Sequence, residues 1–204
     1  MTAETTVEFR ARFGQALALA VAALSAVGLV LTLVEDPAAA LHYGPVLVLV
    51  PVVVWALLGR PAVVVSDAGV EVRNVLRTIE LPWPSIERVD TKYALTLYTA
   101  YGVYSAWAAP APSRAQTMSA GPDDVRHLPE SSYIGGGLRP GDLPTSASGQ
   151  AAAYIRRRWD DLREAGYLDD PRLERDRPRV RWHVGPAAAV LVLAAVAVVA
   201  LRTA

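Results

Sequence analysis

Hydrophobic residues gather in three long runs that contain no Asp, Glu, Lys or Arg: Phe13–Val34, Ala38–Leu58 and Val184–Leu201. At about 1.5 Å per residue, the first two helices would cross a hydrocarbon core of about 30 Å, and the third is near the lower length limit. Buried core helices are a poorer interpretation, because the chain lacks amphipathic elements to cover so much apolar surface. A cleaved signal peptide fits poorly too, since a second apolar run follows the first after a short acidic turn. The pattern predicts three transmembrane helices.

Arginine placement predicts the orientation of these helices. The turn Glu35–Tyr43 between the first two runs has neither Lys nor Arg. Arginines lie instead before the first run, after the second and before the third: Arg10, Arg12, Arg60, Arg172, Arg175, Arg177, Arg179 and Arg181. Because positively charged loops stay on the cytoplasmic side, we expect the N-terminus and Arg60–His183 to be cytoplasmic. The tail Arg202–Ala204 would lie outside. The chain is therefore predicted to be a multi-pass protein of the plasma membrane.

The segment between the second and third runs changes to short strand-like patterns. Apolar and β-branched runs recur at Ala62–Ser66, Val70–Asn74, Arg77–Leu81, Ala94–Ala100 and Val103–Ala109. The first two are joined by the turn sequence "SDAG", and such close spacing is typical of an antiparallel meander. Pro82 and Pro84 remove amide donors and should end the third strand. Trp83, between them, is predicted to be a core residue that closes the end of the sheet.

The rest of this segment divides into a loop and a helix. Residues 110–145 are rich in Pro and Gly and have no apolar periodicity, which predicts a long flexible loop. Apolar residues then recur at near-helical spacing on one stripe that includes Ile155, Trp159 and Leu162. Ser146 or Ser148 can cap this helix, and Gly166 can end it. We expect an amphipathic helix whose stripe, Trp159 included, is buried against the sheet.

Composition excludes several kinds of chemistry. The formal net charge is zero, so bulk charge favours neither nucleic acid nor an acidic substrate. The chain has no Cys, which excludes disulfides, thiolate metal sites, Fe–S clusters and Cys nucleophiles. Asp123, Asp124 and His127 lie close together in sequence, but no regular element would hold them as a metal or acid–base site. His42 and His183 lie in other regions. We therefore expect no enzyme activity, no cofactor and no metal site.

Two stretches and the terminal helix carry a family resemblance. "SDAGVEVRN", "RTIELPWPSIERV" and the helix containing Trp159 resemble the bacterial PH-like (pleckstrin-homology-like) domains of actinobacterial membrane proteins, the low-molecular-weight antigen type. The likeness covers Arg60–Ala109 and Ala147–Tyr167. It implies a cytoplasmic PH-like antiparallel β meander or barrel, closed by a C-terminal amphipathic helix and placed after two membrane helices. The long loop and the third span depart from that family pattern.

These expectations combine into one organisation, a membrane α-helical protein with an α+β domain. Residues 1–59 would form a cytoplasmic N-terminal tail and a transmembrane helical hairpin. Residues 60–168 would form the PH-like domain with its loop 110–145, and residues 169–204 a basic juxtamembrane segment and the third span. The predicted structural core of the domain comprises Trp83, Ile86, Ile155, Trp159 and Leu162.

Two functions remain open at this point. The favoured hypothesis is a membrane-anchored interaction module that presents the PH-like domain to a protein partner at the inner membrane surface, without catalysis. The alternative is a module that binds or senses anionic lipid, because paired arginines can grip a phosphate. The first turn, Ser66–Gly69, has no basic residue, which weakens this alternative. Its candidate anionic contacts are Arg73, Arg77 and the juxtamembrane residues Arg177, Arg179 and Arg181.

Overall fold

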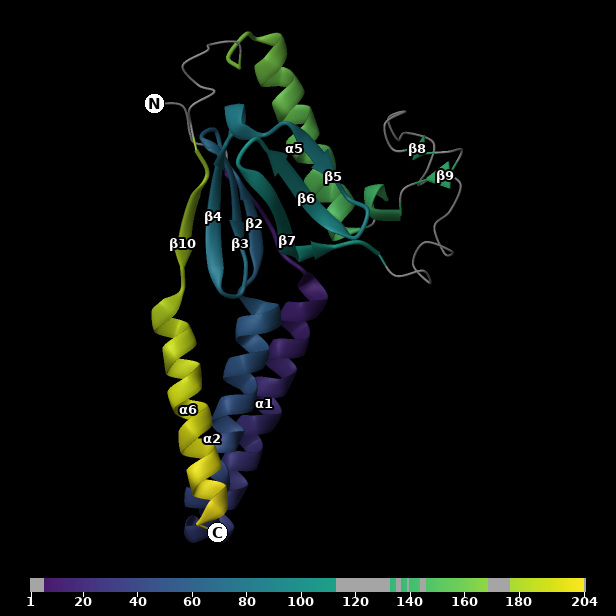
Figure 1. Ribbon diagram of the computed structural model, residues 1–204. Helices are drawn as coiled ribbons and strands as arrows, with labels where there is room; N and C mark the ends of the chain where they lie inside the picture. The colour runs from purple at the N-terminus through teal and green to yellow at the C-terminus, as the bar shows by residue number, and fades with distance from the viewer. Residues whose placement is uncertain are drawn as a thin grey trace. The chain divides into compact units, whose positions relative to one another are not determined.

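The computed structural model describes residues 6–112, 133–134, 137–138, 140–143, 146–168 and 177–203 (Figure 1). Contacts divide the chain into two compact units, and each unit takes residues from distant parts of the sequence. One unit comprises Ala11–Arg60 and Trp182–Ala204, and the other comprises Met1–Arg10 and Pro61–Arg181. The first is helical, and the second contains the sheets.

The helical unit contains three apolar helices that match the three predicted runs. They are α1 (Arg12–Glu35), α2 (Pro37–Val54), which continues into the π-helical turn η1 (Trp55–Gly59), and α6 (Val184–Arg202). All three are long and apolar enough to cross a membrane. The turn between the first two is much shorter than Glu35–Tyr43, because Asp36 caps α2 directly. Its Oδ1 accepts hydrogen bonds from the amides of Ala38 and Ala39 at 2.9 and 3.1 Å, respectively.

Small residues let these helices pack closely. A Cβ added at Gly14 of α1 would lie 2.8 Å from the carbonyl oxygen of Leu58, so the first turn of α1 lies against the end of η1. His42 Nε2, near the start of α2, lies 3.3 Å from the carbonyl oxygen of Thr203, just after α6. Both α1 and α6 therefore run antiparallel to α2. Such close approach at small residues is typical of helix pairs in membranes.

A five-stranded sheet forms the larger part of the other unit. Its order is β1-β2-β3-β4-β10, with β1 at Val7–Phe9, β2 at Ala62–Val65, β3 at Gly69–Arg73, β4 at Arg77–Pro82 and β10 at Arg179–Trp182. The pairs β1–β2, β2–β3 and β3–β4 are antiparallel. The predicted meander supplies only the three central strands. Both edge strands come from outside residues 60–168, from segments predicted to be a cytoplasmic tail and a juxtamembrane stretch.

A second, three-stranded sheet follows instead of a continuation of the first. It consists of β5 (Arg88–Asp90), β6 (Ala94–Thr99) and β7 (Gly102–Pro110), all antiparallel. Between the sheets lies a short 3-10 turn, η2 (Trp83–Ser85). The sheets are not closed into a barrel, so the barrel expectation is wrong. The physical reason is the pair Pro82 and Pro84, which cannot donate to a strand ladder and interrupt the meander after β4.

The core lies between these sheets and one helix, α5 (Ala147–Glu164), which contacts β5, β6 and β7 (Figure 1). Ser146 caps α5 by accepting a hydrogen bond from the Gly149 amide at 2.9 Å. On the face of α5 that packs against the sheets, Ala151, Ala152 and Ile155 are fully buried. The larger Trp159 and Leu162, one and two turns further on, are only half-buried.

The end of the predicted flexible loop is folded. Residues Pro140–Asp142 form the 3-10 turn η4, and Leu143 is fully buried. The buried Asp142 carboxylate accepts hydrogen bonds from Thr91 Oγ1 at 2.7 Å and from Arg156 Nη1 at 2.9 Å. Buried polar and apolar contacts therefore hold residues 140–143, at the end of the predicted loop.

Other parts of residues 110–145 are also ordered, although not all are described. The chain enters this segment beside the β5–β6 turn, where the Ala111 amide donates to the Tyr93 carbonyl at 3.0 Å. Two short strands, β8 (Tyr133–Ile134) and β9 (Gly137–Leu138), form an antiparallel pair. Asp123, Asp124 and His127 lie outside the described residues, as do most residues of the predicted loop.

Candidate functional site

The register of the five-stranded sheet defines two ends. Phe9 pairs with Val63, Ala62 with Arg73, and Arg73 with Thr78. These residues lie at what we call the span end, because only one or two residues of chain separate β1, β2 and β10 there from α1, η1 and α6, respectively. The opposite end, the far end, holds the turn Ser66–Gly69 and Pro82, which pairs with Gly69.

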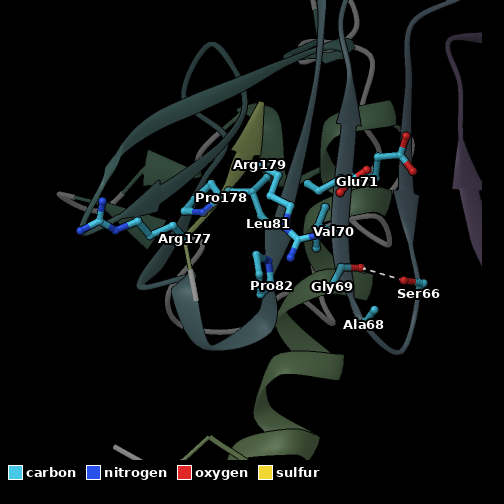
Figure 2. Close-up of a pocket in the computed structure, with 11 residues that line it drawn as sticks. Ser66, Ala68, Gly69, Val70, Glu71, Leu81, Pro82, Arg177, Pro178 and Arg179 are labelled. Atoms are coloured by element: carbon cyan, nitrogen blue, oxygen red, sulfur yellow. Dashed lines mark hydrogen bonds between the residues drawn. The ribbon is translucent and has the colours of Figure 1, made fainter. Parts of the chain in front are cut away.

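A groove of about 630 Å³ lies at the far end (Figure 2). We call it the far-end groove, and it is lined by Ser66, Ala68, Gly69, Val70, Glu71, Glu80, Leu81, Pro82, Arg177, Pro178 and Arg179. The turn that forms one wall is fixed by backbone hydrogen bonds between Ser66 and Gly69 at 3.0 and 3.3 Å. Trp83 supports it from the core, since its Nε1–H donates to the Ser66 carbonyl at 3.1 Å.

Glycine is required at one position in this wall. Gly69 has a φ of 154°, which side chains rarely adopt. A Cβ there would lie 2.2 Å from the Leu81 carbonyl oxygen. The sequence "SDAG" therefore provides both the turn and the close approach of β3 to β4 that forms the floor of the groove.

Side chains of both charge signs line the groove. Glu71 and Glu80 are directly opposed on β3 and β4. Each carboxylate also forms an ion pair with an arginine. Glu71 pairs with Arg73 Nε at 2.8 Å, and Glu80 pairs with Arg181. These ion pairs offset the repulsion between two like charges on neighbouring strands.

The two arginines that line the groove, Arg177 and Arg179, point in different directions. Figure 2 shows Arg177 extended away from the other lining residues and Arg179 extended toward Val70. The guanidinium of Arg177 lies over the Tyr101 ring, 5.3 Å from its centroid. Arg179 makes no ion pair with the residues that the structure describes. It is therefore the groove cation with the best access to a ligand.

The five candidate anionic contacts are not brought together in one cluster. Arg73 and Arg77 lie at the span end, whereas Arg177 and Arg179 lie at the far-end groove. Arg73 is held by Glu71 and lies 3.5 Å from Glu8, and the hydrogen bond that it donates to the Glu71 carboxylate is the main reason that its pKa is raised. Arg172 and Arg175 lie outside the described residues. Sequence neighbourhood did not predict this division, because it depends on the path of β10 along β4.

One polar contact at the span end was missed by sequence reasoning. The Asn74 side chain, in the β3–β4 turn, donates to the Ser105 carbonyl at 2.8 Å and accepts from the Trp107 amide at 2.8 Å. These are the two hydrogen bonds that a neighbouring strand would make with β7. Asn74 therefore completes the edge of β7 and fixes the β3–β4 turn against it. The only signal in the sequence was an asparagine in a turn.

The predicted core residues lie in the packed part of this unit. Trp83, Ile86 and Ile155 are buried, while Trp159 and Leu162 are half-buried against the same cluster. Trp159 is less covered than its stripe predicts, because it lines a small cavity of about 220 Å³. Arg163 lies over its ring, 5.4 Å from the centroid. Among the described residues, no group of three or more His, Cys, Asp or Glu could hold a metal ion.

The structure thus defines a class, an antiparallel two-sheet domain in a chain with three candidate membrane spans. A family model described as the bacterial PH domain matches residues 60–127, which is 68 of the 204 residues. The match supports the PH-like part of the resemblance and does not extend to the actinobacterial antigen type. It indicates an interaction or lipid-binding module of a family that is typically non-catalytic. No curated protein and no solved structure is similar enough to match the chain.

Proposed function

We propose that this chain is a multi-pass protein of the plasma membrane whose PH-like domain binds a protein partner at the cytoplasmic face, without catalysis. The PH-like domain comprises residues 60–168 together with the edge strands β1 and β10. The observation that carries the proposal is the far-end groove, because it presents carboxylates and guanidinium groups side by side. A polar protein segment can satisfy both kinds of group at once.

Chain connectivity supports the proposed topology. Three strands of one sheet, β1, β2 and β10, adjoin the start of α1, the end of η1 and the start of α6, respectively. If the three helices span a bilayer, these three ends must lie on the same side. This agrees with the arginine distribution, which favours the cytoplasmic side for Arg10, Arg60 and Arg181. The N-terminus and the domain are then cytoplasmic, and the C-terminus is outside.

Two features favour a protein over an anionic lipid at the groove. First, Glu71 and Glu80 line it, and each would repel a phosphate. Second, the groove is at the far end of β3. That strand has 5 residues, which places the groove about 14 Å further along the sheet than Arg73, at about 3.4 Å per residue. A headgroup in the adjoining leaflet would be far from Arg179, whereas a cytoplasmic protein would reach it.

Anionic-lipid binding remains the second candidate, and a different set of residues favours it. Arg10, Arg73 and Arg77 lie at or beside the span end, where they adjoin the ends of the candidate spans in sequence or register. Juxtamembrane arginines near an anionic leaflet each contribute about 1 kcal/mol to membrane attraction. The carboxylates of Glu8 and Glu71 reduce this effect for Arg73, because both are close to its guanidinium.

The test is photo-crosslinking of the full-length protein in native membranes. A photoreactive residue would replace Ala68, which is exposed in the groove wall, or Ala153, which is exposed on α5 as a control. We expect a discrete protein adduct from position 68 only, and its loss when Glu80→Arg and Glu71→Arg change the charge of the groove. Adducts with lipid alone from position 68 would contradict the proposal and support the second candidate. Equal protein adducts from both positions would contradict recognition by the groove.

A further inference from the structure

We infer that one corner of the PH-like domain rests in the headgroup layer of the bilayer. The corner consists of the β3–β4 turn, Asn74–Leu76, together with Trp107 of β7, and we call it the span-end corner. Its partner is the lipid leaflet from which the spans emerge. The inference rests on the proposed membrane topology and adds a second contact surface to the protein-binding groove.

Covalent connectivity and register place the corner. Gly59 ends a candidate span, and Ala62 follows three residues later. Three extended residues reach at most about 11 Å. Ala62 pairs with Arg73, the residue before the turn, and paired Cα atoms lie about 5 Å apart. The corner therefore begins within about 16 Å of the span's last residue, by the sum of those two limits.

Two more chain connections leave the same end of the sheet. β1 is followed by Arg10 and Ala11 and then by α1, while β10 is followed by His183 and then by α6. Phe9 at the end of β1 pairs with Val63 near the start of β2, and β10 runs away from the far-end groove, so all three connections leave from the span end. Three links of one or two residues thus join the span end of the sheet to the candidate spans.

The exposed side chains of the corner suit a membrane interface. Leu76 is 55% exposed and Trp107 is 58% exposed. Tryptophan favours the headgroup level, where its ring is apolar and its N–H can remain hydrated. Arg73 and Arg77 flank the turn, and long cationic side chains near an interface can reach phosphates. At the far end the corresponding turn has Ser66, Asp67 and Ala68 instead, which offer no large apolar side chain.

The backbone of the corner also suits a poorly hydrated environment. An open strand edge would leave the Ser105 carbonyl and the Trp107 amide to be satisfied by water. Asn74 satisfies both at 2.8 Å, so that Trp107 can leave water without an unpaired amide. The same two bonds fix the β3–β4 turn, which contains Leu76, to the strand that contains Trp107.

The absence of cysteine allows a direct test in the full chain. Single substitutions Leu76→Cys and Trp107→Cys would each carry an environment-sensitive fluorophore, in nanodiscs of phosphatidylcholine and phosphatidylglycerol. The controls Ala68→Cys at the far end and Tyr93→Cys in the β5–β6 turn are also exposed. Val27→Cys, exposed within α1, reports whether the spans are in lipid. Quenching by a spin label on the lipid headgroup is compared with quenching by aqueous iodide.

We expect lipid-borne quenching at positions 76 and 107 and iodide quenching at 68 and 93. Iodide quenching at 76 and 107, with position 27 protected, would overturn the inference and leave the membrane topology intact. Protection from both quenchers at 76 and 107 would mean that protein covers the corner, and would also overturn it. Equal lipid quenching at all four domain positions would show attraction by the fluorophore itself, against the inference. Iodide quenching at position 27 would overturn both the topology and the inference.

Discussion

The two ends of the five-stranded sheet are built from the same strands and have opposite surface chemistry. The span end combines an exposed leucine and tryptophan with arginines and has its β7 edge completed by Asn74. The far end is a groove with carboxylates and arginines on its walls and a small polar turn at its rim. A short sheet can thus separate two kinds of contact by the length of one strand.

The difference also lies in how each end is supported. At the far end, the turn rests on the core through Trp83, which is 3% exposed and donates to the Ser66 carbonyl. At the span end, the turn is fixed by a partly exposed side-chain amide, that of Asn74. Loss of support should therefore cost more at the far end, because a buried indole contributes far more than an exposed pair of hydrogen bonds.

The contrast between the two ends of the sheet depends first on the membrane orientation of the chain. Reporter fusions at Pro37 and at Ala115 should report opposite sides, with Ala115 cytoplasmic, and a fusion after Ala204 should report outside. The reason is the excess of arginine beside the strands of the sheet. The measurement is paired reporter activity, one enzyme active inside and one outside. An external Ala115 would reverse which compartment the far-end groove faces.

The largest stability effect is expected from Trp83→Ala. Truncation of a buried tryptophan typically costs about 3–5 kcal/mol, and here it also removes the support of the Ser66 turn. Trp107→Ala, at the exposed corner, should cost no more than about 1 kcal/mol. Thermal unfolding of the full chain in nanodiscs, followed by near-ultraviolet circular dichroism, would measure both. Equal losses would show that the two ends are supported alike.

An intermediate effect is expected from Asn74→Ala. It removes two hydrogen bonds, each with a net contribution of about 0.5–1.5 kcal/mol, so a loss of about 1–2 kcal/mol is expected at this partly exposed site. Asn74→Asp is the matched control, because it keeps the acceptor for the Trp107 amide and loses the donor to Ser105. Hydrogen exchange should become faster at the Trp107 amide in the alanine variant and less so in the aspartate variant. Unchanged exchange in both would mean that Asn74 does not complete the edge.

The smallest effect concerns the ion pair between Glu80 and Arg181, which joins β4 to β10. Both side chains are substantially exposed, so the coupling energy should be about 0.2–1 kcal/mol and should fall with salt. Arg181→Glu should increase cleavage by trypsin after Arg179, and the exchanged pair Glu80→Arg with Arg181→Glu should restore resistance. Cleavage that is insensitive to either change would show that β10 is held by its backbone bonds alone.

The local patterns of the sequence determined the three apolar helices, the three central strands and the amphipathic helix. Runs without charge identified α1, α2 with η1, and α6, because hydrophobicity over about 20 residues is independent of the rest of the chain. A continuous β-branched run identified β2, alternation identified β3 and β4, and the burial of Leu95 and Leu97 follows the same period of two. Pro82 and Pro84 marked the end of β4, since proline acts on its own backbone.

Tertiary structure alone decided the edges of the sheet and the composition of each end. β1 and β10 are short and lack strong alternation, so their pairing depends on partners that lie more than 50 residues away in sequence. Asn74 likewise meets Ser105 of β7 31 residues away, and Asp142 meets Thr91 51 residues away and Arg156 14 residues away. Arg73 and Arg77 lie at the span end of the sheet, whereas Arg177 and Arg179, about 100 residues later in the chain, lie at the far-end groove. Such side chains meet only because the fold brings distant backbone segments together. A local sequence pattern carries no information about which distant segment will be the neighbour.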